Sequence, residues 1–426
     1  MKLLILTQYF PPEIGAAPTR LDAMARELTR MGHKVEIVTG MPNYPQGRIF
    51  TGYRGNLYRR ELRDGITIHR VWLYPTVGSG LGRVLNYLSF SLFALFGLFR
   101  AEKPDYLFVE SPPPTLSCPA YLYSLFRGTP FILNVADLWP DSLVDMGLLH
   151  EGMSLNLLSW LERWSYSKAA FVNAVTEGVR DSLLHKKGVP LEKVLFLPNG
   201  VDTERHRPRP PDAGLKNSLG LAGKKIILYS GTLGRAHGLE HVLEAAKILE
   251  AEHDIHFLFL GDGSERPALE RQQREMGLRN VSFHDAVPVE QLAPFQSIAD
   301  SGLVSLRNLP IFEGARPSKM FPLLAAGKPL IFCGSGEGAI LVRRANAGIV
   351  IPPENPQALA AAVPQLLRNS VLVEELGANG RRFVQENHEW GKLVGDWVRE
   401  LQKTPSVQNP VPSHSDQQAF DHPPRN

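Results

Sequence analysis

"KLLILTQYFPPEIGAAPTRLDAMARELTRMGHKVEIVTG", residues 2–40, decides the fold class. Residues 2–8 and residues 34–40 are each an apolar run of strand length. Between them the apolar residues recur at helical spacing, at Leu21, Met24, Ala25 and Leu28. A strand, a helix and a second strand in this order form a βαβ unit, which belongs to a parallel sheet with helices on its faces.

The same alternation continues along the chain and divides it into two series. Strand-like runs recur up to residue 176, a proline-rich polar stretch follows at 194–214, and a second series of strands and helices begins after it. The sequence therefore predicts an α/β protein with two doubly wound, Rossmann-like domains that face each other across an interdomain cleft. The predicted boundaries are 1–198 for the first domain, 199–212 for the linker, 213–385 for the second domain, 386–404 for a C-terminal helix that can cross back to the first domain, and 405–426 for a disordered tail. Ligands of such sheets bind beyond the carboxyl ends of the strands, so the cleft is the expected site.

Composition selects no special class of protein. The 426 residues are 43% hydrophobic and 21% charged, as is usual for a soluble globular protein, and the net charge of +3 selects no partner. We expect no nucleic-acid partner. Cys118 and Cys333 are far apart and form neither a disulfide framework nor a metal-ligand set, so no metal is expected and a reducing cytosol is the simplest compartment. The N-terminal apolar run lacks the cleavage site of a signal peptide.

One region points to phosphates or to a membrane surface. Residues 1–100 hold 13 Lys and Arg but 6 Asp and Glu, and most of the excess lies between Arg48 and Arg83. Such a patch suits phosphates or an anionic membrane, and solvated arginines on a loop are the alternative. The uncharged segment from Tyr87 to Phe99 would span about 20 Å as a helix, short of the roughly 30 Å hydrocarbon core. We expect a buried core helix or a helix in the membrane interface, and no membrane crossing.

Three glycine-rich loops follow predicted strands. They hold Gly15 in the first, Gly231, Thr232, Gly234 and Arg235 in the second, and Gly261 and Gly263 in the third. The backbone N–H groups of such loops, together with a basic side chain, can hold a diphosphate. For Gly15 the alternative is an ordinary loop glycine. Neither the dinucleotide fingerprint nor the P-loop is present, but the three loops together predict a nucleotide site.

Charged residues stand at two other strand ends. Asp137 ends the run "NVAD", where a carboxylate is costly unless it caps a helix or faces the cleft. The stretch "IFEGARPSKMFPLLAAGKPLIF", residues 311–332, puts Glu313, Arg316, Ser318 and Lys319 just ahead of a short helix. Lys319 and the N–H groups after Ser318 can stabilise negative charge on a departing diphosphate, and Glu313 can orient sugar hydroxyls. The alternative is that these residues are surface charges.

These motifs resemble those of the retaining GT-B glycosyltransferases of family GT4. "YSGTLG", "FLGDG", "LPNGVD" and "DLWPDS" carry the resemblance, which extends from residue 1 to about residue 400. It is strongest for the bacterial envelope-polysaccharide branch, which includes colanic acid and O-antigen or fucosamine transferases. The resemblance implies transfer of a sugar from a UDP-, GDP- or dTDP-sugar to an acceptor hydroxyl with retention of configuration, without a metal or a cofactor. It also implies that the C-terminal domain binds the donor and the N-terminal domain binds the acceptor.

The resemblance assigns roles to individual residues. Those at the reacting centre are Asp137, Glu313 and Lys319. Those at the donor diphosphate are Gly15, Gly231, Thr232, Gly234, Arg235 and Lys319. Those near the sugar or the base are Gly261, Gly263, Phe283, Arg316 and Ser318.

The sequence departs from the family pattern at three positions. Thr232 and His237 stand where many relatives have Arg and Lys, and Pro322 stands where the family has a second glutamate that binds the ribose. If Ser318 caps the helix, Pro322 removes a hydrogen bond of the first turn. If the helix starts nearer Phe321, proline is tolerated there.

We therefore expect a retaining hexosyltransferase that acts on a lipid-linked saccharide in bacterial envelope polysaccharide biosynthesis. It would work in the cytoplasm, at the inner face of the inner membrane. The alternatives are a nucleotide-sugar epimerase or hydrolase of the same fold, and a degenerate, non-catalytic binding subunit, which Pro322 suggests.

Overall fold

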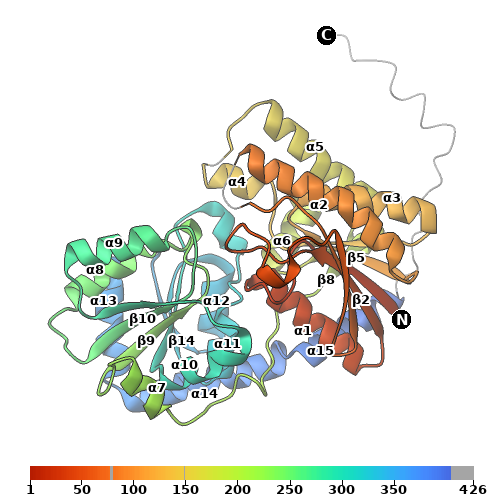
Figure 1. Ribbon diagram of the computed structural model, residues 1–426. Helices are drawn as coiled ribbons and strands as arrows, with labels where there is room; N and C mark the ends of the chain where they lie inside the picture. The colour runs from red at the N-terminus through yellow and green to blue at the C-terminus, as the bar shows by residue number, and fades with distance from the viewer. Residues whose placement is uncertain (77–79, 148, 404–426) are drawn as a thin grey trace.

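The computed structural model describes residues 1–76, 80–147 and 149–403, so the predicted disordered tail lies outside the described residues. Within them the chain forms two separate parallel sheets with helices on both faces (Figure 1). This confirms the predicted fold class of two doubly wound α/β domains.

The first sheet has the strand order β3-β4-β2-β1-β5-β6-β7-β8. Its strands are β1 (Lys2–Leu6), β2 (Lys34–Gly40), β3 (Tyr58–Arg63), β4 (Ile66–Val71), β5 (Tyr106–Ser111), β6 (Phe131–Val135), β7 (Phe171–Ala174) and β8 (Val194–Phe196). Its helices are α1 (Ala16–Arg30), α2 (Leu81–Arg100), α3 (Ser117–Arg127), α4 (Asp141–Asp145), α5 (Met153–Lys168) and α6 (Glu177–Asp181). All the pairs are parallel except the edge hairpin of β3 and β4, which the sequence did not predict.

The second sheet has the strand order β11-β10-β9-β12-β13-β14. Its strands are β9 (Lys225–Ser230), β10 (Ile255–Leu260), β11 (Val281–His284), β12 (Ser301–Ser305), β13 (Leu330–Cys333) and β14 (Gly348–Ile351). The helices of this half are α7 (Ala213–Ser218), α8 (Glu240–Ile248), α9 (Arg266–Met276), α10 (Leu292–Ile298), α11 (Met320–Ala325), α12 (Gly336–Arg344), α13 (Pro356–Leu367) and α14 (Ser370–Asn387), and the last helix, α15 (Trp390–Lys403), packs on the first domain. In each sheet the strand order reverses at the first strand, β1 or β9. A crevice forms at such a reversal, so the loops after β1 and β9 are placed to bind a ligand.

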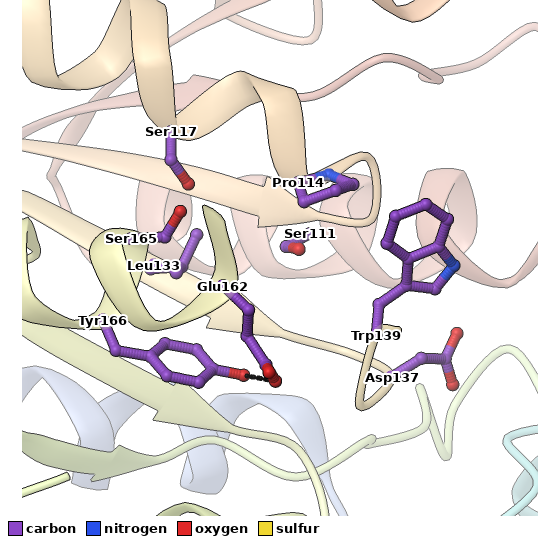
Figure 2. Close-up of a pocket in the computed structure, with 9 residues that line it drawn as sticks. All are labelled: Ser111, Pro114, Ser117, Leu133, Asp137, Trp139, Glu162, Ser165 and Tyr166. Atoms are coloured by element: carbon purple, nitrogen blue, oxygen red, sulfur yellow. Dashed lines mark hydrogen bonds between the residues drawn. The ribbon is translucent and has the colours of Figure 1, made fainter. Parts of the chain in front are cut away.

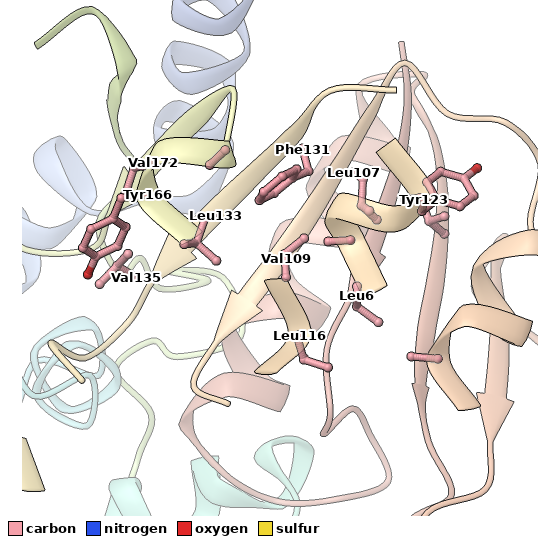
Figure 3. Packing of buried hydrophobic residues seen from close by; sticks show 14 of the residues in the cluster. Leu6, Leu107, Val109, Leu116, Tyr123, Phe131, Leu133, Val135, Tyr166 and Val172 are labelled. Atoms are coloured by element: carbon pink, nitrogen blue, oxygen red, sulfur yellow. The ribbon is translucent and has the colours of Figure 1, made fainter. Parts of the chain in front are cut away.

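Each sheet is apolar on both faces because successive side chains of a strand point in opposite directions. Figure 3 shows the core on one face of the first sheet, where Leu6, Val109 and Leu133 pack under α2, α3 and α5. The intervening residues, such as Ile5 and Phe108, face the other core, which α1 and α15 cover. The first domain therefore has two cores, and the C-terminal helix α15 closes one of them.

Helix α2 is longer than the sequence predicted. It has 20 residues rather than 13, and by length and composition it could span a membrane. The helix is therefore longer than the Tyr87–Phe99 segment from which we expected no membrane crossing. One side of α2 packs onto the sheet, with Phe90 and Ala94 in the core and Gly97 against Val38 of β2. Only 28% of the most apolar 18-residue stretch of α2 is buried. The side of α2 that does not pack onto the sheet therefore faces outward.

The chain passes between the domains twice, at neighbouring points. The Val201 N–H donates to the His388 carbonyl at 2.7 Å, and Val201 also pairs with Glu389 as a single parallel bridge. Beyond this bridge α15 packs against α1 and β8 of the first domain.

Candidate active site

A cleft of about 1350 Å³ lies between the two domains, where the carboxyl ends of both sheets meet. Both domains contribute to its walls. The predicted site residues that line it are Asp137, Thr232, Glu313, Arg316, Ser318 and Lys319. The structure thus brings the predicted residues of the 311–332 stretch, the second glycine loop and Asp137 into one space.

Lys319 is the charged centre of the second-domain wall. It is the last residue before α11, and its ammonium donates to the Tyr229 hydroxyl and lies 4.2 Å from the centre of the Tyr229 ring. In the described part of the chain no carboxylate lies within ion-pair distance of its Nζ. Desolvation lowers the pKa of Lys319 from 10.5 to about 7. An ammonium held in this way, without a carboxylate, favours an anionic ligand.

His237 orients the Lys319 ammonium. Its Nε2 lies 3.2 Å from Lys319 Nζ, and its Nδ1 lies 3.3 Å from the Ser305 carbonyl. The carbonyl only accepts and the ammonium only donates, so the network assigns the proton to Nδ1 and leaves Nε2 to accept. Burial and the adjacent Lys319 charge keep the pKa of His237 well below its usual value, so the ring is neutral. His237 therefore acts here as a hydrogen-bond acceptor for Lys319.

Glycines bring the two loops of the second domain into direct contact. Gly231 has φ of 142°, and a Cβ on it would lie 3.2 Å from Lys319 Cε. A Cβ on Gly261 would lie 1.9 Å from the Gly231 carbonyl, and one on Gly263 would lie 2.3 Å from the Leu233 carbonyl. These glycines are needed because one backbone packs on the other. Neither Gly261 nor Gly263 lines the cleft itself.

Three other predicted residues lie away from the cleft wall. The Arg235 side chain is 69% exposed, and its Nε lies 3.4 Å from the Glu265 carboxylate. Neither Arg235 nor the adjacent Gly234 lines the cleft. Phe283 stacks on Phe259 with the ring centres 4.9 Å apart, on the edge strand β11. Their roles at the diphosphate and at the base stay predictions.

Gly15 precedes α1 in an extended conformation, and no close contact requires a glycine at this position. The next residues, Ala16 and Ala17, line the cleft. The amino-terminal end of α1 therefore faces the cleft, as the first glycine loop predicted, while a contact by Gly15 stays a prediction.

Pro322 does not disturb the helix that carries it. Helix α11 begins at Met320, so Pro322 lies in the first turn, where an N–H has no partner within the helix. Ser318 makes no capping hydrogen bond. Of the two alternatives for the start of this helix, the one that places it near Phe321 agrees better with the structure, in which the helix begins one residue earlier, at Met320. Pro322 is not a cleft residue.

Glu313 and Arg316 are held by neighbours from α12 and its loop. The Ser335 hydroxyl donates to Glu313 Oε1 at 2.6 Å, while Arg316 pairs with Glu337. The Glu337 carboxylate also accepts from the backbone N–H of Gly178, at 3.0 Å, at the start of α6 in the first domain. Arg316 thus contributes to a contact between the domains at the edge of the cleft.

Asp137 stands on the opposite wall, in the loop after β6. Figure 2 shows its carboxyl pointing away from Glu162, beside a hollow of about 10 Å³ that has room for a single water molecule. The Asp137 side chain is exposed to the solvent of the cleft, so its desolvation is partial. Desolvation raises the pKa of Asp137, and the charge of Arg20 opposes the rise. Lys187 fixes the loop by binding both Asp141 and Glu162 at 2.9 Å.

Sequence reasoning missed an ion pair in the first-domain wall. Arg20 of α1 pairs with Glu110 at the end of β5, and both side chains line the cleft. Burial raises the pKa of Glu110, and Arg20 opposes the rise. The sequence did contain a signal for Glu110, because this acid stands at the carboxyl end of an apolar strand-like run, as Asp137 does.

Comparison with known proteins agrees with this geometry. Residues 15–200 match the model of the glycosyl transferase 4-like domain, and residues 215–383 match that of glycosyl transferases group 1. A protein of Escherichia coli, provisionally named colanic acid biosynthesis glycosyl transferase WcaI, is 30% identical over 416 residues, which cover 94% of this chain and 100% of that protein.

Two solved structures share the fold. Sucrose-phosphate synthase from Thermosynechococcus elongatus has a TM-score of 0.74 at 17% identity, over 94% of this chain and 99% of that one. HepE from Anabaena, solved in complex with UDP-glucose, has a TM-score of 0.71 at 16% identity, over 95% and 100%. The family models span most of this chain on two facing parallel-sheet domains, and the protein therefore belongs to the GT4-like, group 1 glycosyltransferases of the GT-B fold.

Proposed function

We propose that this protein transfers a sugar, with retention of configuration, from a nucleoside diphosphate sugar to a lipid-linked saccharide in bacterial envelope polysaccharide biosynthesis. The observation that carries the donor class is Lys319, a desolvated ammonium in the cleft wall without a carboxylate partner among the described residues. When the bond from the sugar to the diphosphate breaks, negative charge grows on the phosphate oxygens. A fixed ammonium stabilises that charge more strongly in a desolvated wall than in water.

The relatives support the choice of substrates. HepE has been solved with UDP-glucose, and WcaI is named for colanic acid biosynthesis. The retaining course, the hexosyl type of the transferred group and the absence of a metal are inferred from the GT4 resemblance. Among the described residues no cluster of His, Cys, Asp and Glu is arranged to hold a metal ion.

An apolar surface beside the cleft supports the lipid-linked acceptor and a peripheral position at the cytoplasmic face of the inner membrane. Helices α2, α3 and α5 lie together on one side of the first domain (Figure 1). Their exposed apolar residues are Leu81, Val84, Leu85, Leu88, Leu92, Phe96 and Phe99 on α2, Leu122, Leu125 and Phe126 on α3, and Met153, Leu157 and Trp160 on α5. An apolar face of this kind is typical of a helix that lies in a membrane interface.

Basic side chains border this surface and lead to the cleft. Arg100 lies 4.7 Å from the centre of the Phe96 ring, and Arg127 lies 5.5 Å from that of Phe99. On the first turns of α2, Arg83 and Tyr87 line the cleft, and Arg83 Nε donates to the Tyr87 hydroxyl at 2.9 Å. The same helix therefore joins the apolar surface to the cleft, as an acceptor with a lipid chain and a polar sugar would require.

The donor is tested by thermal shift with UDP-, GDP- and dTDP-sugars, because a ligand that binds only the folded protein raises its melting temperature. We expect one base class to raise the melting temperature of the wild type and to leave that of Lys319→Met unchanged. Equal shifts in both proteins would contradict the role of Lys319. Incubation with the bound donor alone then distinguishes an epimerase or hydrolase, which consumes the donor without an acceptor.

The membrane position is tested by flotation with phosphatidylcholine vesicles that contain or lack anionic phosphatidylglycerol. We expect the wild type to float and the double variant Leu88→Asp, Leu92→Asp to stay behind. Ile340→Asp, at an exposed apolar residue of the second domain, is the matched control. No flotation of the wild type with either vesicle would overturn this part of the proposal.

A further inference from the structure

A chain of buried polar side chains runs under α15 from the C-terminal helix to the cleft. The Trp397 indole Nε1 donates to Asn173 Oδ1 at 3.0 Å, and Asn173 Nδ2 donates to Asn134 Oδ1 at 2.7 Å. Asn134 Nδ2 then donates to Glu110 Oε2 at 2.7 Å. None of these four residues is more than 2% exposed. The last of them, Glu110, pairs with Arg20 in the cleft wall.

The strand register explains why these side chains meet. Glu110 is the direct partner of Asn134 between β5 and β6, and Asn134 is the direct partner of Asn173 between β6 and β7. All three therefore point to the same face of the first sheet, the one on which Phe108 and the α15 residues form a core. Polar groups in such a core are costly unless they are hydrogen-bonded, and this chain connects each of the three to the next.

The two ends of the chain fix its direction. An indole N–H can only donate, so the Asn173 oxygen must face Trp397 and its amino group must face Asn134. An ionised carboxylate can only accept, so Asn134 must turn its amino group to Glu110. Both amides thus have one orientation, and every donor points toward Glu110. This arrangement stabilises the charged form of Glu110, which needs a cation beside it.

That cation is Arg20. Besides the pair with Glu110, its Nη1 lies 3.5 Å from Asn199 Oδ1, at the point where the chain leaves the first domain. Arg20, Glu110 and Asn199 all line the cleft. Asp137 lies in the same wall, and Arg20 is the charge that opposes the desolvation of its carboxyl.

We propose that Trp397, acting through Asn173, Asn134 and Glu110, positions the Arg20 guanidinium near Asp137 in the first-domain wall of the cleft. Trp397 is thus a positioning residue although it lies on the last helix of the described chain. The kinetic part of the test rests on the proposed transferase function, whereas the structural part does not. A small displacement of Arg20 would change turnover and leave donor binding unchanged, because Lys319, on which the proposed donor class rests, is in the second domain.

The test compares Trp397→Phe with Trp390→Phe. Both tryptophans are on α15 in the same core, but Trp390 lies outside the polar chain. We expect Trp397→Phe to lower kcat about tenfold with the donor KM within about twofold, and Trp390→Phe to leave both within about twofold. In an Arg20→Lys background, Trp397→Phe should have no further effect on kcat, since it acts through Arg20. Equal effects of the two phenylalanine variants, or effects of Trp397→Phe and Arg20→Lys that multiply, would overturn the proposal.

A structural measurement keeps the inference testable if no donor is turned over. The Arg20 Nε–H signal in a nitrogen-15 spectrum is assigned by its loss in Arg20→Lys. We expect it to shift in Trp397→Phe and to stay in place in Trp390→Phe. A shift without any turnover in the wild type would contradict the transferase function alone, and an unmoved signal would contradict the positioning role.

Discussion

Replacing Lys319 by methionine should make the protein more stable and unable to bind its donor. Methionine keeps the apolar stem of the side chain and removes the ammonium, which has no carboxylate partner among the described residues. The folded protein holds this group with a pKa of about 7 against an ordinary value of 10.5. Between these values the unfolded chain binds more protons than the folded one, so stability rises with pH from about 7 to about 10.5.

The pKa also sets the size of the effect. One unit of pKa corresponds to about 1.4 kcal/mol, so the fall from 10.5 to about 7 is about 5 kcal/mol at most. Water in the cleft screens part of this, and we expect Lys319→Met to raise the free energy of unfolding by about 1–3 kcal/mol at pH 6. At pH 10.5 the gain should have disappeared, because the unfolded chain then loses the proton as well.

Urea unfolding at pH 6 and pH 9 checks this, with donor-induced thermal shifts measured on the same samples. Lys328→Met is the matched control, since burial also lowers the pKa of Lys328 but its Nζ binds the Ser297 carbonyl outside the cleft. The control should keep the donor-induced shift. Our reasoning is refuted if Lys319→Met lowers stability at pH 6, or if it gains as much at pH 9 as at pH 6.

Three further predictions concern other parts of the molecule. Gly263→Ala places a methyl group 2.3 Å from a carbonyl of the second glycine loop and should cost about 1–3 kcal/mol in urea unfolding, whereas Gly52→Ala, in open space, should cost little. Glu337→Gln weakens the contact with α6 of the first domain by about 1–3 kcal/mol and should increase the radius of gyration in X-ray scattering, and an unchanged radius would contradict that role. Burial raises the pKa of Glu13 to about 7, so its stabilising effect is complete below pH 4.5 and is lost as the pH rises through 7. Glu13→Gln should remove this part of the pH dependence of the melting temperature between pH 5 and pH 8, and parallel profiles would argue against it.

Local pattern was sufficient for the fold and for part of the site. The βαβ rhythm predicted both sheets, and the rule that parallel sheets bind ligands at their carboxyl ends placed Asp137 and Lys319 in one cleft. Loop position alone did not predict side-chain direction. Arg235 follows Gly234 as expected, but its exposed side chain lies beside Glu265, thirty residues further along the chain, and does not line the cleft, so its role at the diphosphate stays a prediction.

The rest depended on contacts that no local pattern contains. The antiparallel β3–β4 hairpin and the outward side of α2 are two such features. The pair of Arg20 and Glu110 joins residues from a helix and a strand that are ninety positions apart in sequence. Sequence reasoning singled out neither residue and therefore missed the pair.

The placement of α15 has a consequence for how the protein is made. The ribosome releases the first domain some two hundred residues before it releases Trp390–Lys403, yet this helix covers one of the two cores of that domain. Until then Phe108 and Phe171 face water or a chaperone, although their sheet is otherwise complete. Folding of the first domain is therefore completed only when α15 emerges, and we expect a fragment that stops near residue 200 to aggregate.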